Sequence, residues 1–211
     1  MSKRSLPILV ERTVADIHAL RLRAASEFER KLRDTWGAAT TCTKGCSGCC
    51  HHPFFISVAE GILLYKYLAS HGLWTPSLQQ RVKDTRDKTL GVSWGVWMLS
   101  NTPCSLLEDN LCIAYDARPL SCRVTYAVSD PELCHPHKMS EETMLVNRGE
   151  DQAAFNESEI KLLKRHGLDG VVVPLSEAVL AGEQVVTGKL SLERVERMFL
   201  ADFARVAHGK I

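Results

Sequence analysis

The chain is 211 residues long, with 45% hydrophobic residues, 24% charged residues and a formal net charge of +1. These values are ordinary for a globular protein, and they show neither the composition of a disordered chain nor the basic excess typical of nucleic-acid-binding surfaces. Nucleic acid is therefore not an expected partner.

The first predicted element is a long amphipathic helix over residues 8–36. Apolar residues recur at spacings of three and four, while Arg and Glu fill the opposite face. Gly37 is expected to end this helix, because glycine tolerates the left-handed cap conformation. A loop rich in small residues then runs to about residue 53.

The next segment contains helix-start signals. Residues Ser57 to Glu60 resemble a capping box, in which the serine oxygen and the glutamate side chain both satisfy early backbone N–H groups. They predict a helix that stops at 71–72. A further helix is expected over about 75–90, with proline near its start, and a short tryptophan-rich segment follows.

The C-terminal part is again regular. Helices are expected over three segments: 150–166, 176–181 and 191–207. Ser176 and Ser191 are the expected N-caps of the last two. Residues 171–173 carry the one clear strand signal.

These patterns predict a mainly α fold with little strand. We expect a single helical domain over residues 1–211, with a cysteine-cluster core at about 40–137 and helical flanks at 8–36 and 150–208.

The compartment bears on how the cysteines are interpreted. The N-terminal residues lack the apolar core and cleavage site of a signal peptide, and no apolar run is long enough to span a membrane. We therefore expect a cytoplasmic protein with no membrane partner. In a reducing cytoplasm, cysteines serve as metal ligands or redox groups more often than as disulfides.

The eight cysteines fall into two groups. Their members are Cys42, Cys46, Cys49 and Cys50 in the first, then Cys104, Cys112 and Cys122 with Cys134 trailing in the second. Two thiol-rich loops distant in sequence suit a closed metal site, because short spacings let several sulfurs converge and the second loop completes the shell. Scattered core cysteines would not place four thiols within nine positions beside Gly45 and Gly48.

Two occupants of such a site remain open, a zinc ion and an iron–sulfur cluster. Zinc commonly takes two closely spaced cysteine pairs, and Cys104 and Cys112 are too far apart for the second pair. Adjacent Cys49 and Cys50 are awkward for one ion, because neighbouring side chains point in different directions, although they could reach different metal atoms of a cluster. We therefore favour an iron–sulfur cluster of the [4Fe–4S] type over zinc.

A third interpretation, a radical S-adenosylmethionine enzyme, is less favoured than an iron–sulfur or zinc site. The spacing of Cys42, Cys46 and Cys49 also matches the cluster loop of radical S-adenosylmethionine enzymes. Those enzymes resemble partial barrels of alternating strands and helices, which this strand-poor pattern does not predict.

Histidines accompany both cysteine groups: His51, His52, His135 and His137. Imidazole binds zinc and iron, so each is an open candidate ligand. A second, more exposed site would use the 134–137 tract.

Four motifs carry a family resemblance: Cys42-Thr-Lys-Gly-Cys46-Ser-Gly-Cys49-Cys50, Pro103-Cys104, Leu111-Cys112-Ile-Ala-Tyr115 and Arg118-Pro-Leu-Ser-Cys122-Arg123. In combination they closely resemble the YkgJ-type cysteine-cluster family, described as chelating zinc or iron, to which flagellin lysine N-methylases are distantly similar. The resemblance implies metal chelation by the seven cysteines from Cys42 to Cys122. Cys134 lies outside the matching part.

Three cationic side chains near the cysteines are candidates to stabilise the metal centre. A four-thiolate site holding zinc or an oxidised [4Fe–4S] cluster carries about two negative charges. Lys44, Arg118 and Arg123 are expected to offset this charge and to donate hydrogen bonds to sulfur.

The class of function stays open at this point. Two classes of function fit the sequence. One is a cluster-dependent enzyme, either methyltransferase-like or redox, and the other is a zinc-stabilised module that binds a protein partner. No glycine-rich nucleotide loop and no Ser/His/Asp order is present, so no catalytic residue is predicted.

Overall fold

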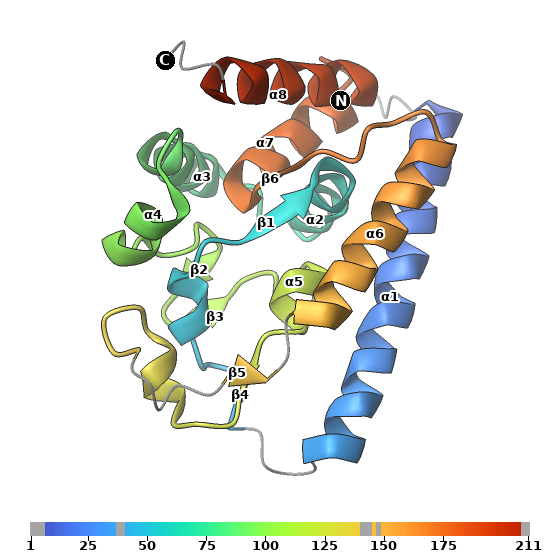
Figure 1. Cartoon of the computed structure of the whole chain (residues 1–211). Helices are drawn as coiled ribbons and strands as arrows, with labels where there is room; N and C mark the ends of the chain where they lie inside the picture. The colour runs from blue at the N-terminus through green and yellow to red at the C-terminus, as the bar shows by residue number, and fades with distance from the viewer. Residues whose placement is uncertain (1–6, 37–40, 140–144, 147–148, 208–211) are drawn as a thin grey trace.

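A computed structural model of the chain describes residues 7–36, 41–139, 145–146 and 149–207 (Figure 1). Its α-helices are α1 (Ile8–Trp36), α2 (Val58–Ser70), α3 (Pro76–Thr89), α4 (Trp94–Ser100), α5 (Leu120–Arg123), α6 (Gly149–Arg165), α7 (Leu175–Val186) and α8 (Leu192–Ala207). Short 3₁₀ helices are η2 (Gly48–His51), η3 (Tyr115–Ala117) and η4 (Pro131–Cys134). The predicted mainly α fold is confirmed.

The strands are short and pair antiparallel, two by two. The pairs are β1 (Phe55–Ser57) with β6 (Val172–Pro174), β2 (Leu107–Glu108) with β3 (Leu111–Cys112), and β4 (Tyr126–Ala127) with β5 (Leu145–Val146). The β1–β6 pair has an architectural role, because β1 leads directly into α2 and β6 directly into α7. It therefore aligns the starts of these two helices.

The helix predicted over 8–36 is confirmed at both ends, and Gly37 lies outside the described residues. The predicted cap at Ser191 is also confirmed, since its Oγ accepts the Arg194 N–H at 3.3 Å. The cap predicted at Ser176 is wrong. The chain passes from β6 straight into α7, so Pro174 is the N-cap and Ser176 falls inside the first turn.

The capping box at the start of α2 is half correct. Ser57 Oγ accepts the backbone N–H of Glu60 at 3.1 Å, as predicted. The Glu60 side chain, however, accepts the N–H of Leu120 at 3.0 Å, across 60 residues of chain. A tertiary contact thus replaces the local one, because Glu60 is buried against the loop that carries α5.

The core is centred on α2 and α7, which pack backbone to backbone. A Cβ added at Gly61 would lie 2.2 Å from the Ala178 carbonyl oxygen, and one at Gly182 would lie 2.6 Å from the Gly61 oxygen. Only glycine permits this approach at both positions. Helix α1 packs on α2, α3 packs on α7, and α8 lies across α7 (Figure 1).

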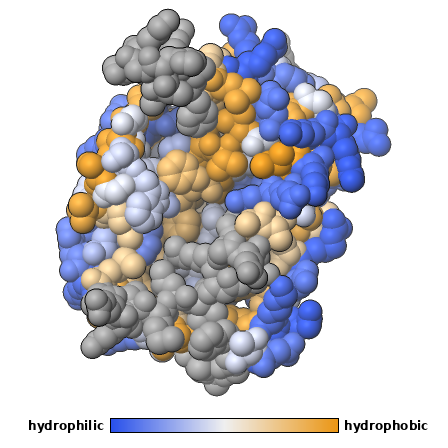
Figure 2. Space-filling model, in the orientation of Figure 1, coloured by the Kyte–Doolittle hydropathy of each residue, from blue (hydrophilic) through white to orange (hydrophobic). Residues whose placement is uncertain are grey.

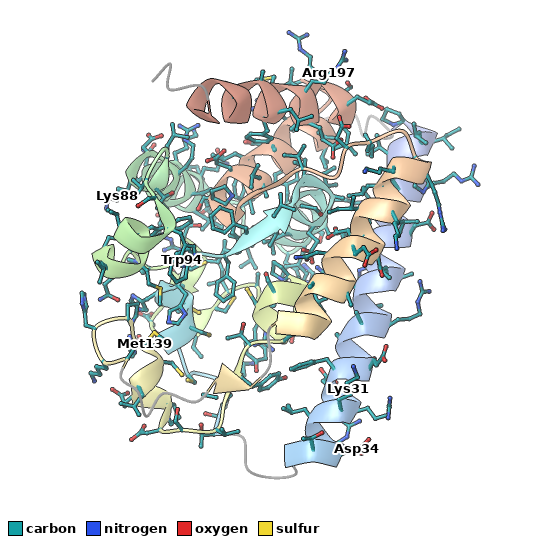
Figure 3. All side chains as sticks on the ribbon, in the orientation of Figure 1. Lys31, Asp34, Lys88, Trp94, Met139 and Arg197 are labelled. Carbon is teal, nitrogen blue, oxygen red and sulfur yellow. The ribbon has the colours of Figure 1, made fainter. Side chains whose placement is uncertain are left out.

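A second, smaller apolar cluster lies between α1, α5 and α6. It consists of Ala25, Phe28, Leu120, Val124 and Phe155. Charged side chains of α1 outside this cluster are exposed, as Lys31 and Asp34 illustrate (Figure 3). Hydrophilic side chains accordingly follow the outer edge formed by α1 and α6, while apolar ones gather toward the middle of this face (Figure 2). Within the described ranges, no helix has the length and apolar character needed to cross a bilayer.

Candidate metal centre

The two cysteine loops are joined by hydrogen bonds. The backbone N–H of Cys104 donates to the carbonyl of Cys50 at 2.7 Å. Ser47 Oγ donates to Asn110 Oδ1 at 3.3 Å, which connects the first loop to the turn between β2 and β3. The loops therefore meet through the protein chain itself.

The β2–β3 turn brings Cys112 into this region. Asp109 and Asn110 adopt positive φ values of 49° and 60°, as the two central residues of a type I′ hairpin turn do. The sequence analysis did not predict this hairpin. The adjacent Asp109-Asn110 pair was the signal that could have identified it.

One cavity of about 50 Å³ collects thiols from both loops. The cysteines that line it are Cys46, Cys49, Cys50, Cys104, Cys112 and Cys122. Its apolar wall includes Phe54, Leu64, Leu106 and Leu175. Six of the eight predicted ligands thus share one enclosed space.

Cys42 lies beside this group although it does not line the cavity. Its sulfur accepts the backbone N–H of Ala127 in β4 at 3.1 Å. The thiol also lies close enough to Cys46 and Cys49 for their charges to affect its pKa.

Cys49 interacts electrostatically with all of the other thiols in the group. Its charge acts on the pKa of every other cysteine in the group: Cys42, Cys46, Cys50, Cys104, Cys112 and Cys122. The Cys49 and Cys50 side chains are hydrogen-bonded to each other. The expectation that these neighbours point in different directions is therefore not met, because η2 turns both thiols toward the same cavity.

Burial governs the acidity of these thiols. It raises the pKa of five of them: Cys42, Cys46, Cys104, Cys112 and Cys122. The pKa of Cys104 rises to about 12. For Cys50 the hydrogen bond with Cys49 is the larger cause of a raised pKa. Thiols in this state bind a metal only by releasing their protons, so metal binding and deprotonation are coupled.

Backbone N–H groups partly oppose this effect of burial. The N–H two residues further along donates to sulfur at three of the cysteines: Gly48 to Cys46, Leu106 to Cys104, and Ala114 to Cys112. Such donors stabilise a negative sulfur and are a feature of thiolate-bound metals. The donor set therefore fits a thiolate metal centre.

The sulfurs surround a space instead of meeting at a point. Among the residues that the structure describes, no three His, Cys, Asp or Glu side chains are placed to hold one metal ion together.

Arg118 is the cation of the cavity. It lines the wall, its guanidinium lies 3.6 Å from the Tyr115 ring centroid, and its Nε donates to the Tyr115 carbonyl at 3.0 Å. Its charge opposes the rise in pKa at Cys42, Cys112 and Cys122.

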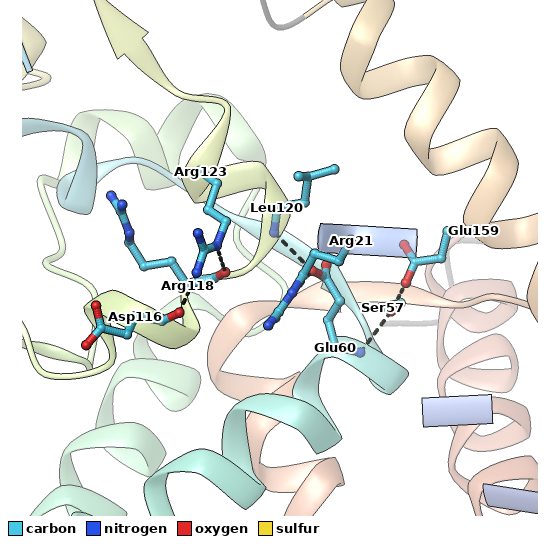
Figure 4. A network of polar contacts seen from close by, with 8 residues as sticks. All are labelled: Arg21, Ser57, Glu60, Asp116, Arg118, Leu120, Arg123 and Glu159. Atoms are coloured by element: carbon cyan, nitrogen blue, oxygen red, sulfur yellow. Dashed lines mark hydrogen bonds and ion pairs between the residues drawn. The ribbon is translucent and has the colours of Figure 1, made fainter. Parts of the chain in front are cut away.

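The other two predicted cations lie differently. Arg123 Nε donates to the Arg118 carbonyl at 3.1 Å, and its Nη2 donates to that of Asp116 (Figure 4). Arg123 therefore stabilises the backbone of the loop that contains Asp116 and Arg118. Lys44 is exposed, with its Nζ 5.5 Å from the Tyr115 ring centroid.

Cys134 lies in η4, which packs on η2, and neither Cys134 nor the four histidines line the cavity. Cys134 is buried, and a Cβ added to Gly48 would lie 2.7 Å from its Cβ. His52 Nε2 is 2.6 Å from the Cys134 carbonyl oxygen, and the His51 and His135 rings lie 5.0 Å apart. His137 is exposed. The structure thus brings seven of the eight cysteines together and sets Cys134 apart.

Comparison with known protein families matches residues 41–154 to the family CxxCxxCC, described as "Putative zinc- or iron-chelating domain". The match covers more than half of the chain and includes all eight cysteines. No curated protein and no solved structure gives a significant match. The chain belongs to the CxxCxxCC family of cysteine-rich domains associated with zinc or iron chelation.

Proposed function

We propose that this protein binds an iron–sulfur cluster through thiolates contributed by both cysteine loops. The proposed ligand set is drawn from Cys42, Cys46, Cys49, Cys50, Cys104, Cys112 and Cys122. The observation that carries the proposal is the single cavity lined by six thiols, three from each loop. It agrees with the metal chelation associated with the family.

The number of thiols favours a cluster over one zinc ion. Zinc is held by four ligands in a closed site, and this cavity presents six thiols with Cys42 beside it. A cluster contains several metal atoms, so adjacent Cys49 and Cys50 can serve different ones. Zinc bound by four of these thiols is the alternative, and it would make the protein a metal-stabilised interaction module.

The surrounding residues would adjust the properties of the cluster. Leu64, Leu106 and Leu175 form an apolar wall that limits the access of water, while Arg118 offsets negative charge. Burial and charge of this kind set the reduction potential of an iron–sulfur centre. When bound, such a cluster supplies one-electron transfer, which is the chemistry that a cluster-dependent enzyme would use.

We assign Cys134 a packing role beside Gly48 instead of a ligand role. Its burial and its separation from the cavity support this assignment. The His51 and His135 rings lie 5.0 Å apart, and we leave both histidines outside the proposed ligand set.

The test is chemical analysis of protein purified without oxygen. The proposal predicts a brown protein that contains iron and acid-labile sulfide. Colourless protein with stoichiometric zinc and no sulfide would contradict the cluster and favour the zinc alternative.

A further inference from the structure

A buried polar cluster lies next to the start of α5 (Figure 4). It contains Arg21 of α1, Ser57 and Glu60 at the start of α2, and Glu159 of α6. Each of these residues is at most 3% exposed. Burying charged groups is unfavourable unless they are paired and hydrogen-bonded, so this cluster requires a structural reason.

Glu60 acts on the helix that carries Cys122. Its Oε1 accepts the backbone N–H of Leu120 at 3.0 Å, and Leu120 is the first residue of α5. The first N–H groups of a helix have no partner within the helix. In a helix of four residues this external acceptor defines the start of the turn. Cys122, two residues later, lines the cavity.

Arg21 faces the same carboxylate. Its Nη1 lies 4.0 Å from Glu60 Oε1, and within the described part of the chain its Nε and Nη1 have no hydrogen-bond acceptor. Burial lowers the pKa of Arg21, and the negative charges of Glu60, Glu159 and Cys122 oppose that decrease. The guanidinium is thus a buried counter-charge for the Glu60 carboxylate.

We propose that Glu60 is a positioning residue for the metal centre, with Arg21 as its buried counter-charge. Glu60 fixes the first turn of α5 so that the Cys122 sulfur faces the other thiols. The part that concerns metal affinity rests on the function proposed above. The orientation of Cys122 can be measured independently in metal-free protein.

The first experiment measures the alkylation rate of each cysteine in reduced, metal-free protein, by iodoacetamide labelling and peptide mass spectrometry. Glu60→Ala leaves the Leu120 N–H without its acceptor, so Cys122 should label about tenfold faster relative to the other cavity cysteines. Arg21→Met should act in the same direction. Glu60→Gln keeps a carbonyl oxygen for Leu120 and should restore most of the wild-type rate.

Glu196 provides the matched control. It is also a buried glutamate that accepts backbone N–H groups, those of Asp169, Gly170 and Val171, but it lies on α8 and holds the loop before β6. Glu196→Gln should not change the labelling of Cys122 relative to the other cysteines. An unchanged Cys122 rate in Glu60→Ala, or an equal increase at every cysteine, would overturn the proposal.

The second experiment titrates Zn²⁺ against a competing chelator, well below the unfolding temperature of each variant. Loss of a supporting contact around metal ligands typically weakens metal affinity about 10–100-fold, which we expect for Glu60→Ala but not for Glu196→Gln. Wild-type affinity in Glu60→Ala would contradict the positioning role. If wild-type protein bound neither zinc nor iron, the proposed function would fail, and the labelling rates would still decide the role of Glu60.

Discussion

The backbone N–H of Cys104 donates to the carbonyl of Cys50 at 2.7 Å, across more than fifty residues of chain. This bond joins the two cysteine loops next to the residues that line the cavity. The main apolar core is centred on α2 and α7, and most of its residues lie outside these loops, although Leu106, Ala114 and Ala117 of the second loop belong to it. We therefore expect the loops to depend on metal more strongly than the helices do.

Metal removal tests this expectation. Chelated, reduced protein should keep its far-UV circular dichroism signal, because α2 and α7 pack without the thiols. Hydrogen exchange should accelerate in peptides covering 42–53 and 103–123 but not in those covering 58–70 or 175–186. Loss of the helical signal on chelation, as in a zinc finger, would contradict this division.

Arg118 and Lys44 offer a comparison between two cations near Tyr115. Arg118 lines the cavity, whereas Lys44 is exposed, where solvent screens its charge. Arg118→Gln should weaken metal binding about tenfold or more, because negative charge near the thiolates loses its offset. Lys44→Gln should change affinity by less than about threefold. Chelator competition measures both, and equal effects would argue against a specific role for Arg118.

Glu159 predicts a pH dependence of stability. Burial, and then the charge of Glu60, raise its pKa from 4.5 to about 8, while Ser57 and Arg21 act in the opposite direction. The folded state therefore retains a proton that the unfolded state releases, so the free energy of unfolding falls as pH rises from about 4.5 to about 8.

The slope from this one group is at most about 1.4 kcal/mol per pH unit. Glu159→Gln removes the titration and keeps an oxygen acceptor for Ser57. Denaturant unfolding across this pH range should give a flatter profile for the variant than for wild type. Parallel profiles would show that Glu159 is ionised in the folded protein throughout.

Gly61 and Gly182 make the α2–α7 contact sensitive to a single methyl group. Gly61→Ala should lower the free energy of unfolding by about 1–3 kcal/mol or more, since its Cβ would meet backbone atoms that cannot rotate away. Gly95 of α4 is the control, because no atom lies within 4 Å of a Cβ added there. Gly95→Ala should stay within about 1 kcal/mol of wild type. Equal losses in the two variants would contradict close packing of α2 on α7.

Local signals explain which features the sequence predicts well. The apolar spacing of α1 and the N-cap at Ser57 depend on residues within one or two helical turns, so both can be recognised without the fold. The strand at 171–173 was expected, but its partner β1 was not, because strand pairing is a contact between distant segments.

Long-range contacts explain what the sequence left undetermined. The sequence analysis placed all eight cysteines in the candidate ligand set, with Cys134 trailing outside the family motifs. Which six of them line one cavity depends on the tertiary structure, which motif spacing does not show. Motif spacing also did not reveal the Glu60–Leu120 bond, since a glutamate three residues after a serine already has a local explanation. The only sequence signal for a tertiary role was one carboxylate in an otherwise apolar segment.

Metal content of Cys112→Ala and Cys134→Ala, purified in parallel with wild type without oxygen, tests the two-loop metal centre most directly. Each variant removes one thiol, which is partly buried at Cys112 and fully buried at Cys134. Of these two residues, only Cys112 lines the cavity. The account predicts that Cys112→Ala loses bound metal and thermal stability together, while Cys134→Ala retains wild-type metal content. Unchanged metal loading in Cys112→Ala would contradict a centre shared by the two loops.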